Sequence, residues 1–149
     1  MKRHAALIPL THHHHHALTQ VRKLRVAAKG TDGDRLGRAK KFLDFFHSDT
    51  LKHFREEEEV IFPLVADVVE AREALERVMI QHLQIHSLVH SLEGEVEDGI
   101  SRPETLLRIA VRLEEHIRLE EKVVFPLIET IVGADLGSVT LLTRERAAG

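Results

Sequence analysis

Apolar residues recur every three to four positions along most of the chain, a spacing that predicts four amphipathic helices. The clearest stripe lies in the fourth helix and consists of Leu106, Ile109, Leu113, His116, Glu120, Val123, Val124 and Leu127. Glycine and proline punctuate the ends of these segments. We therefore expect helices over about residues 11–29, 34–61, 71–98 and 103–132, followed by a tail over 134–149 that forms a short extra helix or frays.

Four such helices joined by short links predict an all-α fold, an antiparallel up-down four-helix bundle. The length of 149 residues fits one domain over residues 1–149. The hydrophobic share of 43% and the charged share of 30% are typical of a soluble protein. No apolar run approaches the roughly 20 residues that span a bilayer, and no signal-peptide pattern is recognisable. We expect a cytoplasmic protein without a membrane partner.

Residue usage narrows the chemistry further. The formal net charge of −3 predicts no basic field for nucleic acid, so we expect no nucleic-acid partner. The absence of cysteine excludes disulfides, thiolate metal sites and a cysteine nucleophile. Histidine is the outlier, with 12 residues, five of them in the run from His12 to His16. The available chemistry is therefore that of imidazoles and carboxylates.

One motif occurs twice, as H-x-R-x-E-x-x-V-[IV]-F-P. The first copy runs from His53 to Pro63 and the second from His116 to Pro126, at a constant offset of 63 residues. A constant offset across the whole motif indicates an internal repeat of a helix-pair unit. We expect the two copies to occupy equivalent places in the fold.

Residues four apart lie on one face of a helix, so His53 stacks with Glu57 and His116 with Glu120. Both pairs occupy steps of an apolar stripe that should face the core. A single pair of this kind is more often a surface ion pair, but the doubling at core-facing positions argues against that reading. An unpaired carboxylate in a core costs several kcal/mol or takes up a proton. Two such pairs in one small domain predict a bound cation.

The other two helices also carry core-facing histidines. In the third helix His82 replaces a core residue, and His86 lies one turn along, where it binds metal or lines a cavity. In the first helix both His14 and His15 project along the apolar stripe. We favour His14, because its spacing to the following apolar residues matches that of His82. The remaining acids near the motifs lie off the stripes and are expected to face solvent; they are Glu56, Glu58, Glu59, Glu114, Glu115 and Glu121.

The candidate ligands come from all four helices. They are His14, His15, His53, Glu57, His82, His86, His116 and Glu120. Imidazoles and carboxylates without a thiolate suit two transition-metal ions such as Fe or Mn, with Zn as an alternative. Two divalent cations against two carboxylates leave a positive site, which should attract an anionic bridging group such as oxide or hydroxide.

The order His, H-x-x-x-E…F-P, His, H-x-x-x-E…F-P between His14 and Pro126 resembles the hemerythrin-like, or HHE cation-binding, family. Members of that family are four-helix bundles that hold a non-haem di-iron centre. The resemblance implies that Glu57 and Glu120 bridge two iron ions and that the histidines are terminal ligands. It implies no cofactor beyond the metal.

Three functions from different classes fit these residues. The first is a di-iron protein that binds or senses O₂ or a related small oxidant and signals through a separate, unidentified protein partner. The second is a di-iron oxidoreductase that removes peroxide, for which His13, His16 and His86 are the spare proton donors. The third is storage or handling of iron or zinc by the histidine-rich first helix. The absence of tyrosine disfavours the enzyme, and the sequence predicts no oligomeric state.

Overall fold

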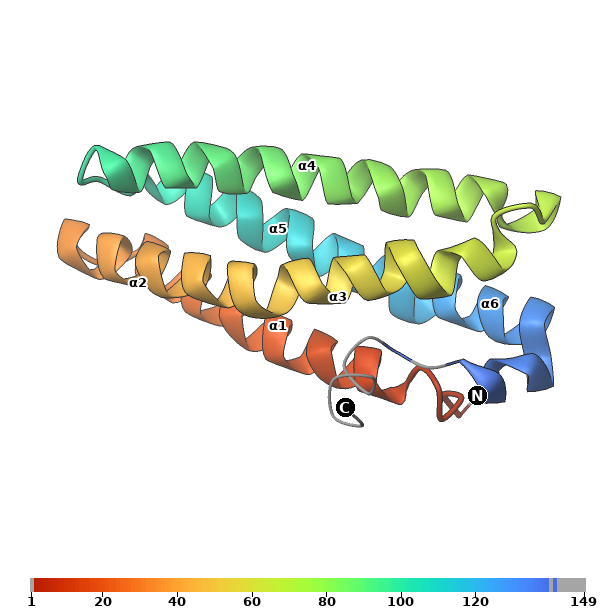
Figure 1. The fold of residues 1–149 in the computed structure, drawn as a ribbon. Helices are drawn as coiled ribbons and strands as arrows, with labels where there is room; N and C mark the ends of the chain where they lie inside the picture. The colour runs from red at the N-terminus through yellow and green to blue at the C-terminus, as the bar shows by residue number, and fades with distance from the viewer. Residues whose placement is uncertain (1, 140, 142–149) are drawn as a thin grey trace.

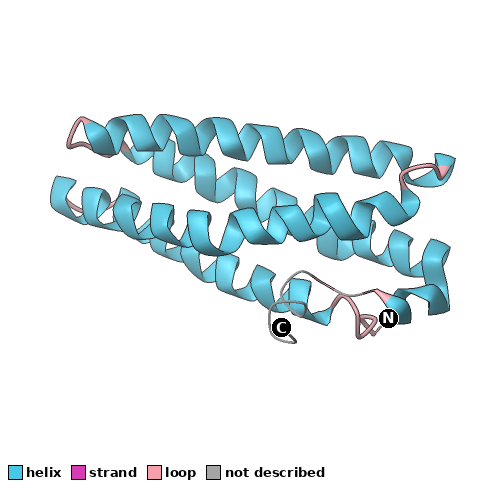
Figure 2. Ribbon diagram, viewed as in Figure 1, coloured by secondary structure: helices cyan, strands magenta, loops and turns pink. Residues whose placement is uncertain are grey.

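The computed structural model describes residues 2–139 and 141. Their fold is four antiparallel helical rods, with no strand among the described residues (Figures 1 and 2). This confirms the expected all-α four-helix bundle. No helix in the described part of the chain is long and apolar enough to cross a membrane.

The rods are built from the following elements. The first is α1 (Ile8–Ala28), and the second joins α2 (Asp32–Phe45), η1 (Phe46–Thr50), α3 (Leu51–Glu56), η2 (Glu57–Ile61) and η3 (Phe62–Val65). The third is α4 (Arg72–Glu97), preceded by the short η4 (Val69–Ala71). The fourth joins α5 (Pro103–Leu119), η5 (Glu120–Val124) and α6 (Phe125–Val132).

The helix starts follow from local chemistry. The first helix begins at Ile8, earlier than expected, and Pro9 lies in its first turn, where a missing N–H breaks no helical hydrogen bond. The second begins at Asp32 because Thr31 and Asp34 form a capping box. The backbone N–H of Asp34 donates to the Thr31 hydroxyl at 3.1 Å, and the Asp34 carboxylate accepts from the N–H of Thr31 at 3.0 Å.

The predicted tail is described only in part. A 3₁₀ helix, η6 (Gly133–Ser138), follows α6 and buries Leu136. Leu141 is also buried, with 1% of its surface exposed. Residues 140 and 142–149 of the predicted tail lie outside the described residues.

The core consists of two apolar clusters with a polar layer between them. Around the bundle, α1 packs against α2 and α5, and α4 packs against α2 and α5. One cluster includes Leu24, Phe42 and Leu92, and the other includes Leu10 and Ile128. The buried residues between the clusters are mainly histidine and glutamate.

Three π-helical segments interrupt the α-helices of the second and fourth rods. Two of them, η2 and η5, begin at Glu57 and Glu120, the glutamates of the repeated motif. They therefore lie at the same offset of 63 residues as the motif itself. A π-helical turn inserts one extra residue, which rotates the following side chains relative to an uninterrupted α-helix. This rotation changes which glutamates face the centre of the bundle.

Candidate metal centre

Six of the eight predicted ligands meet in the polar layer. Each helical rod contributes at least one of them, and each is buried, with no more than 5% of its surface exposed. They are His14 from α1, His53 and Glu57 from α3 and η2, His82 from α4, and His116 and Glu120 from α5 and η5.

These six residues form two groups that share both glutamates. One group combines Glu57 and Glu120 with His14 and His53, and the other combines the same glutamates with His82 and His116. Within each group the candidate ligand atoms lie within 4.8 Å of one another. The arrangement offers two neighbouring cation sites, each with two imidazoles and two carboxylates.

All four histidines direct the same ring nitrogen, Nε2, toward the carboxylates. The distances are 2.8 Å from His14 to Glu120 Oε1, 3.2 Å from His53 to Glu57 Oε2, 3.2 Å from His82 to Glu57 Oε1, and 3.2 Å from His116 to Glu120 Oε1. Nε2 is therefore the nitrogen that each ring offers to a cation.

The other ring nitrogen, Nδ1, faces an outer residue in each case. The pairs are His14 with Glu121 Oε1 at 2.9 Å, His53 with His13 Nδ1 at 3.1 Å, His82 with Glu58 Oε2 at 3.6 Å, and His116 with Gln81 Oε1 at 2.9 Å. The oxygen acceptors Glu121 and Gln81 fix the tautomers of His14 and His116 that leave Nε2 free to bind a metal.

The outer contacts follow the internal repeat. Glu58 and Glu121 each follow a central glutamate, and each faces the histidine of a different rod. Likewise His13 and Gln81 each precede a histidine of the centre and face the histidine of a motif. The two halves of the repeat therefore differ at one outer position. The first half has the imidazole of His13 there, and the second half has the amide of Gln81.

The chemistry of the donor set fits metal ions. Several buried polar atoms of the cluster have no hydrogen-bond partner, an arrangement that is unfavourable in a protein interior. They are His53 Nε2, both carboxylate oxygens of Glu57, His82 Nε2, His116 Nε2, and Glu120 Oε2. Cations placed between these atoms would satisfy them, and nitrogen and oxygen donors without sulfur suit iron, manganese or zinc.

The comparisons with known proteins agree with this geometry. The model of the hemerythrin HHE cation-binding domain matches residues 7–128, which include all six central residues. The chain belongs to the hemerythrin HHE cation-binding family. No curated protein and no solved structure matches it at a significant level.

In this hemerythrin-family chain, protons balance the charges of the cluster when no cation is bound. Burial and the neighbouring Glu120 carboxylate raise the pKa of Glu57 well above its usual range. Burial also opposes ionisation of Glu120, but His116 and other hydrogen-bonding neighbours hold its pKa well below the usual range. Burial alone would lower the pKa of His82, but contacts with Glu57 and Glu58 raise it to about 9. Metal ions must therefore displace protons from this centre.

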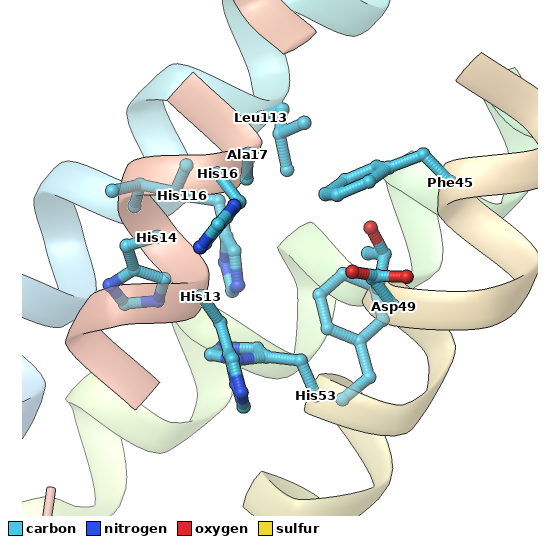
Figure 3. Close-up of a pocket in the computed structure, with 12 residues that line it drawn as sticks. His13, His14, His16, Ala17, Phe45, Asp49, His53, Leu113 and His116 are labelled. Carbon is cyan, nitrogen blue, oxygen red and sulfur yellow. The ribbon is translucent and has the colours of Figure 1, made fainter. Parts of the chain in front are cut away.

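A small cavity adjoins three histidines of the centre, His14, His53 and His116 (Figure 3). It holds about 30 Å³ of space for water-sized molecules. Apolar side chains that include Leu113 line one part of it, and the more polar lining includes His13, His16 and Asp49. The space is large enough for a water molecule or a ligand of similar size.

The two remaining predicted ligands, His15 and His86, lie outside both groups of candidate ligands. His15 is exposed on α1, because a rotation of about 100° per residue carries it away from the buried His14. His86 is also exposed, and its ring packs edge-on against Phe46 and Phe54, each at 5.7 Å. The central glutamates lie in one layer of the bundle with His82. His86 follows His82 by one helical turn and is therefore too far along α4 to join that layer.

The expectation that the surrounding acids face solvent is confirmed for the exposed Glu58, Glu59 and Glu115 and is wrong for Glu56. Glu56 is fully buried, and its Oε2 lies 4.0 Å from His13 Nδ1. Glu121 is half-buried and contacts His14, and the carboxylate of the exposed Glu58 lies 3.6 Å from His82 Nδ1. Their shared offset of 63 residues was the available signal. It was missed because counting along an ideal α-helix does not include the extra residue of a π-helical turn.

Proposed function

We propose that this chain binds two iron ions and that the pair binds or senses O₂ or a related small oxidant. The observation that supports this proposal is the sharing of two buried carboxylates by two histidine pairs. Because both groups use the same two carboxylates, two ions bound there would be neighbours, not occupants of separate sites. The match to the hemerythrin family model supports cation binding. The donor atoms suit iron, manganese or zinc, and the choice of iron rests on the resemblance to that family.

A pair of iron ions bound here would supply two neighbouring redox centres that exchange electrons with a small oxidant. The protein's own residues set the conditions for that exchange. Glu57 and Glu120 would contact both ions, and the two apolar core clusters limit the access of water from either end. The outer contacts, such as that of Gln81 with His116, hold the imidazoles in place.

The cavity beside His14 and His53 supports the proposal that the ligand is a small molecule. Its volume of about 30 Å³ suits a diatomic molecule or a peroxide. Leu113, with 2% of its surface exposed, contributes to its apolar lining. Oxidant that reaches the centre through this cavity would therefore first meet His14, His53 and His116, which all line it.

Metal analysis and spectroscopy test the proposal. The purified protein should contain two iron ions per chain, and its optical spectrum should change when air is admitted to the reduced, oxygen-free sample. Leu113→Phe narrows the cavity and should slow that change while the two ions remain bound. Leu106→Phe is the matched control, because Leu106 is equally buried on α5 and does not line the cavity. Two zinc ions, or no response to oxidant, would contradict the proposal.

A peroxide-removing oxidoreductase is the second candidate, and the polar side of the cavity favours it. His13, His16 and Asp49 are ionisable side chains within the lining, so they could carry protons to and from a bound peroxide. Sustained consumption of peroxide in the presence of an electron donor would support this function. Reversible binding without turnover would support sensing. Uptake of many more than two ions per chain would instead indicate iron or zinc storage.

A further inference from the structure

A second candidate binding site lies at the other end of α1, away from the metal centre. It is a groove of about 790 Å³ along the C-terminal half of α1 and the N-terminal half of α2, which pack side by side (Figure 1). Five basic side chains line it: Arg22, Lys23, Lys29, Arg38 and Lys41. We call it the basic groove.

The basic groove lies in a positively charged part of a chain whose net charge is negative. Residues 20–41 contain eight basic and two acidic residues, a net charge of +6, whereas the whole chain carries −3. The rest of the chain is therefore at −9. A local field of this sign attracts anions even though the protein as a whole is acidic.

The five basic side chains of the groove make no ion pair with any acidic side chain in the described part of the chain. Nearby arginines differ, since Arg25 pairs with Glu114 at 2.6 Å and Arg35 pairs with Asp32. The one acidic residue that lines the groove is Asp34, and its carboxylate already accepts the backbone N–H of Thr31. The positive charge of the groove is therefore left for a ligand from outside.

Gly37 is a second, independent sign of a ligand. It lies inside α2, where glycine is less stable than alanine, and a Cβ atom built on it meets nothing within 4 Å. Packing within the chain therefore does not require glycine at this position. A bare backbone in the wall of a groove allows a bound molecule to approach closely.

We propose that the basic groove binds a compact anion with several linked phosphate groups, such as a nucleoside polyphosphate or inorganic polyphosphate. Arginine binds phosphate through two parallel hydrogen bonds, and lysine adds point charges. From Arg22 to Lys29 the groove extends about 10 Å along α1, which suits a few linked phosphates. A single carboxylate or sulfate would leave most of the five cations without a partner. The groove lies about 18 Å along α1 from His14 at Val26, so this proposal is independent of the metal centre.

Calorimetric titration of the metal-loaded protein with tripolyphosphate and with ATP tests this proposal. We expect saturable binding that weakens as salt is added. The double variant Lys23→Glu/Lys41→Glu should bind at least tenfold more weakly. The control Arg72→Glu/Arg77→Glu makes the same change in net charge on exposed residues of α4 and should leave the affinity unchanged. Equal weakening in both variants would overturn the proposal, because net charge alone would then explain the binding.

Backbone NMR locates the bound anion. The amide signals of Gly33 and Gly37 should shift on titration, and Gly37→Leu should weaken binding. Tighter binding of ATP than of tripolyphosphate would identify a nucleotide as the ligand, and the reverse would identify inorganic polyphosphate. Metal content measured after each titration separates binding from chelation. Loss of metal without glycine shifts, or tighter binding of duplex DNA than of either anion, would overturn the proposal.

Discussion

The outer contact of Gln81 with His116 allows a sharp test of the metal centre. Gln81→Leu keeps a similar side-chain volume but removes the oxygen that lies 2.9 Å from His116 Nδ1. The imidazole, with only 1% of its surface exposed, would then lose the acceptor that fixes its orientation. We therefore expect weaker metal binding in a protein that still folds.

The size of the effect follows from the usual role of such contacts. Loss of an outer partner typically weakens metal binding by about 10–100-fold, or about 1.4–2.7 kcal/mol. Metal stabilises the folded state by mass action, so the loss appears in thermal stability at fixed free metal. At about 2–4 °C per kcal/mol for a chain of 149 residues, the metal-loaded Tm should fall by about 3–11 °C more than the metal-free Tm.

Calorimetry of both forms, together with competition against a chromophoric chelator, measures this difference. Gln84→Leu is the matched control, because Gln84 lies on the same helix and is not among the residues that face Nδ1 of the four central histidines. It should change the loaded and metal-free proteins equally. If Gln81→Leu also lowered both forms equally and left the chelator competition unchanged, the contact would have no role in metal binding.

Three further predictions concern the central residues. Glu57→Ala or Glu120→Ala should remove both metals, because each carboxylate belongs to both groups; retention of two ions in elemental analysis would contradict bridging. His14→Ala should lose one metal and His15→Ala none, since only His14 is buried in the layer; equal metal counts would refute this assignment. The raised pKa of His82, about 9, gives the metal-free protein a stabilising contribution that is complete below the unfolded value of 6.5 and lost as pH rises through about 9. Metal retention should instead improve with rising pH, because ligand histidines bind in the neutral form. Urea unfolding of the metal-loaded and metal-free proteins across pH 6–10 should therefore give free energies of unfolding that change with pH in opposite directions.

The fold and most of the candidate centre could be predicted because they depend on periodicity and on a repeat. The stripe through Leu113 and His116 defines the buried face of the fourth helix, and the repeat identifies the matching face of the second. The choice between His14 and His15 also came from spacing. The structure buries His14 and exposes His15, in agreement with the preference for His14.

Periodicity could not predict the surroundings of the centre. Local sequence does not reveal π-helical turns, so the buried position of Glu56 was assigned to solvent. The contact of His13 with His53 joins residues 40 positions apart on different rods, and it depends on how closely α1 approaches α3. The basic groove could not be predicted for a related reason. The net charge is a sum over the whole chain, and only the fold shows which charged side chains lie together.

The paired π-helical segments make the chain similar to a dimer fused into a single polypeptide. Each half supplies one central glutamate at the start of its π-helical turn and one outer glutamate directly after it. In a symmetric dimer of one helix pair, any substitution near the axis would appear twice and would affect both metals alike. Fusion removes that restriction. Position 13 and position 81 can then differ, and the two groups of candidate ligands can have different surroundings while Glu57 and Glu120 keep corresponding places in the repeat.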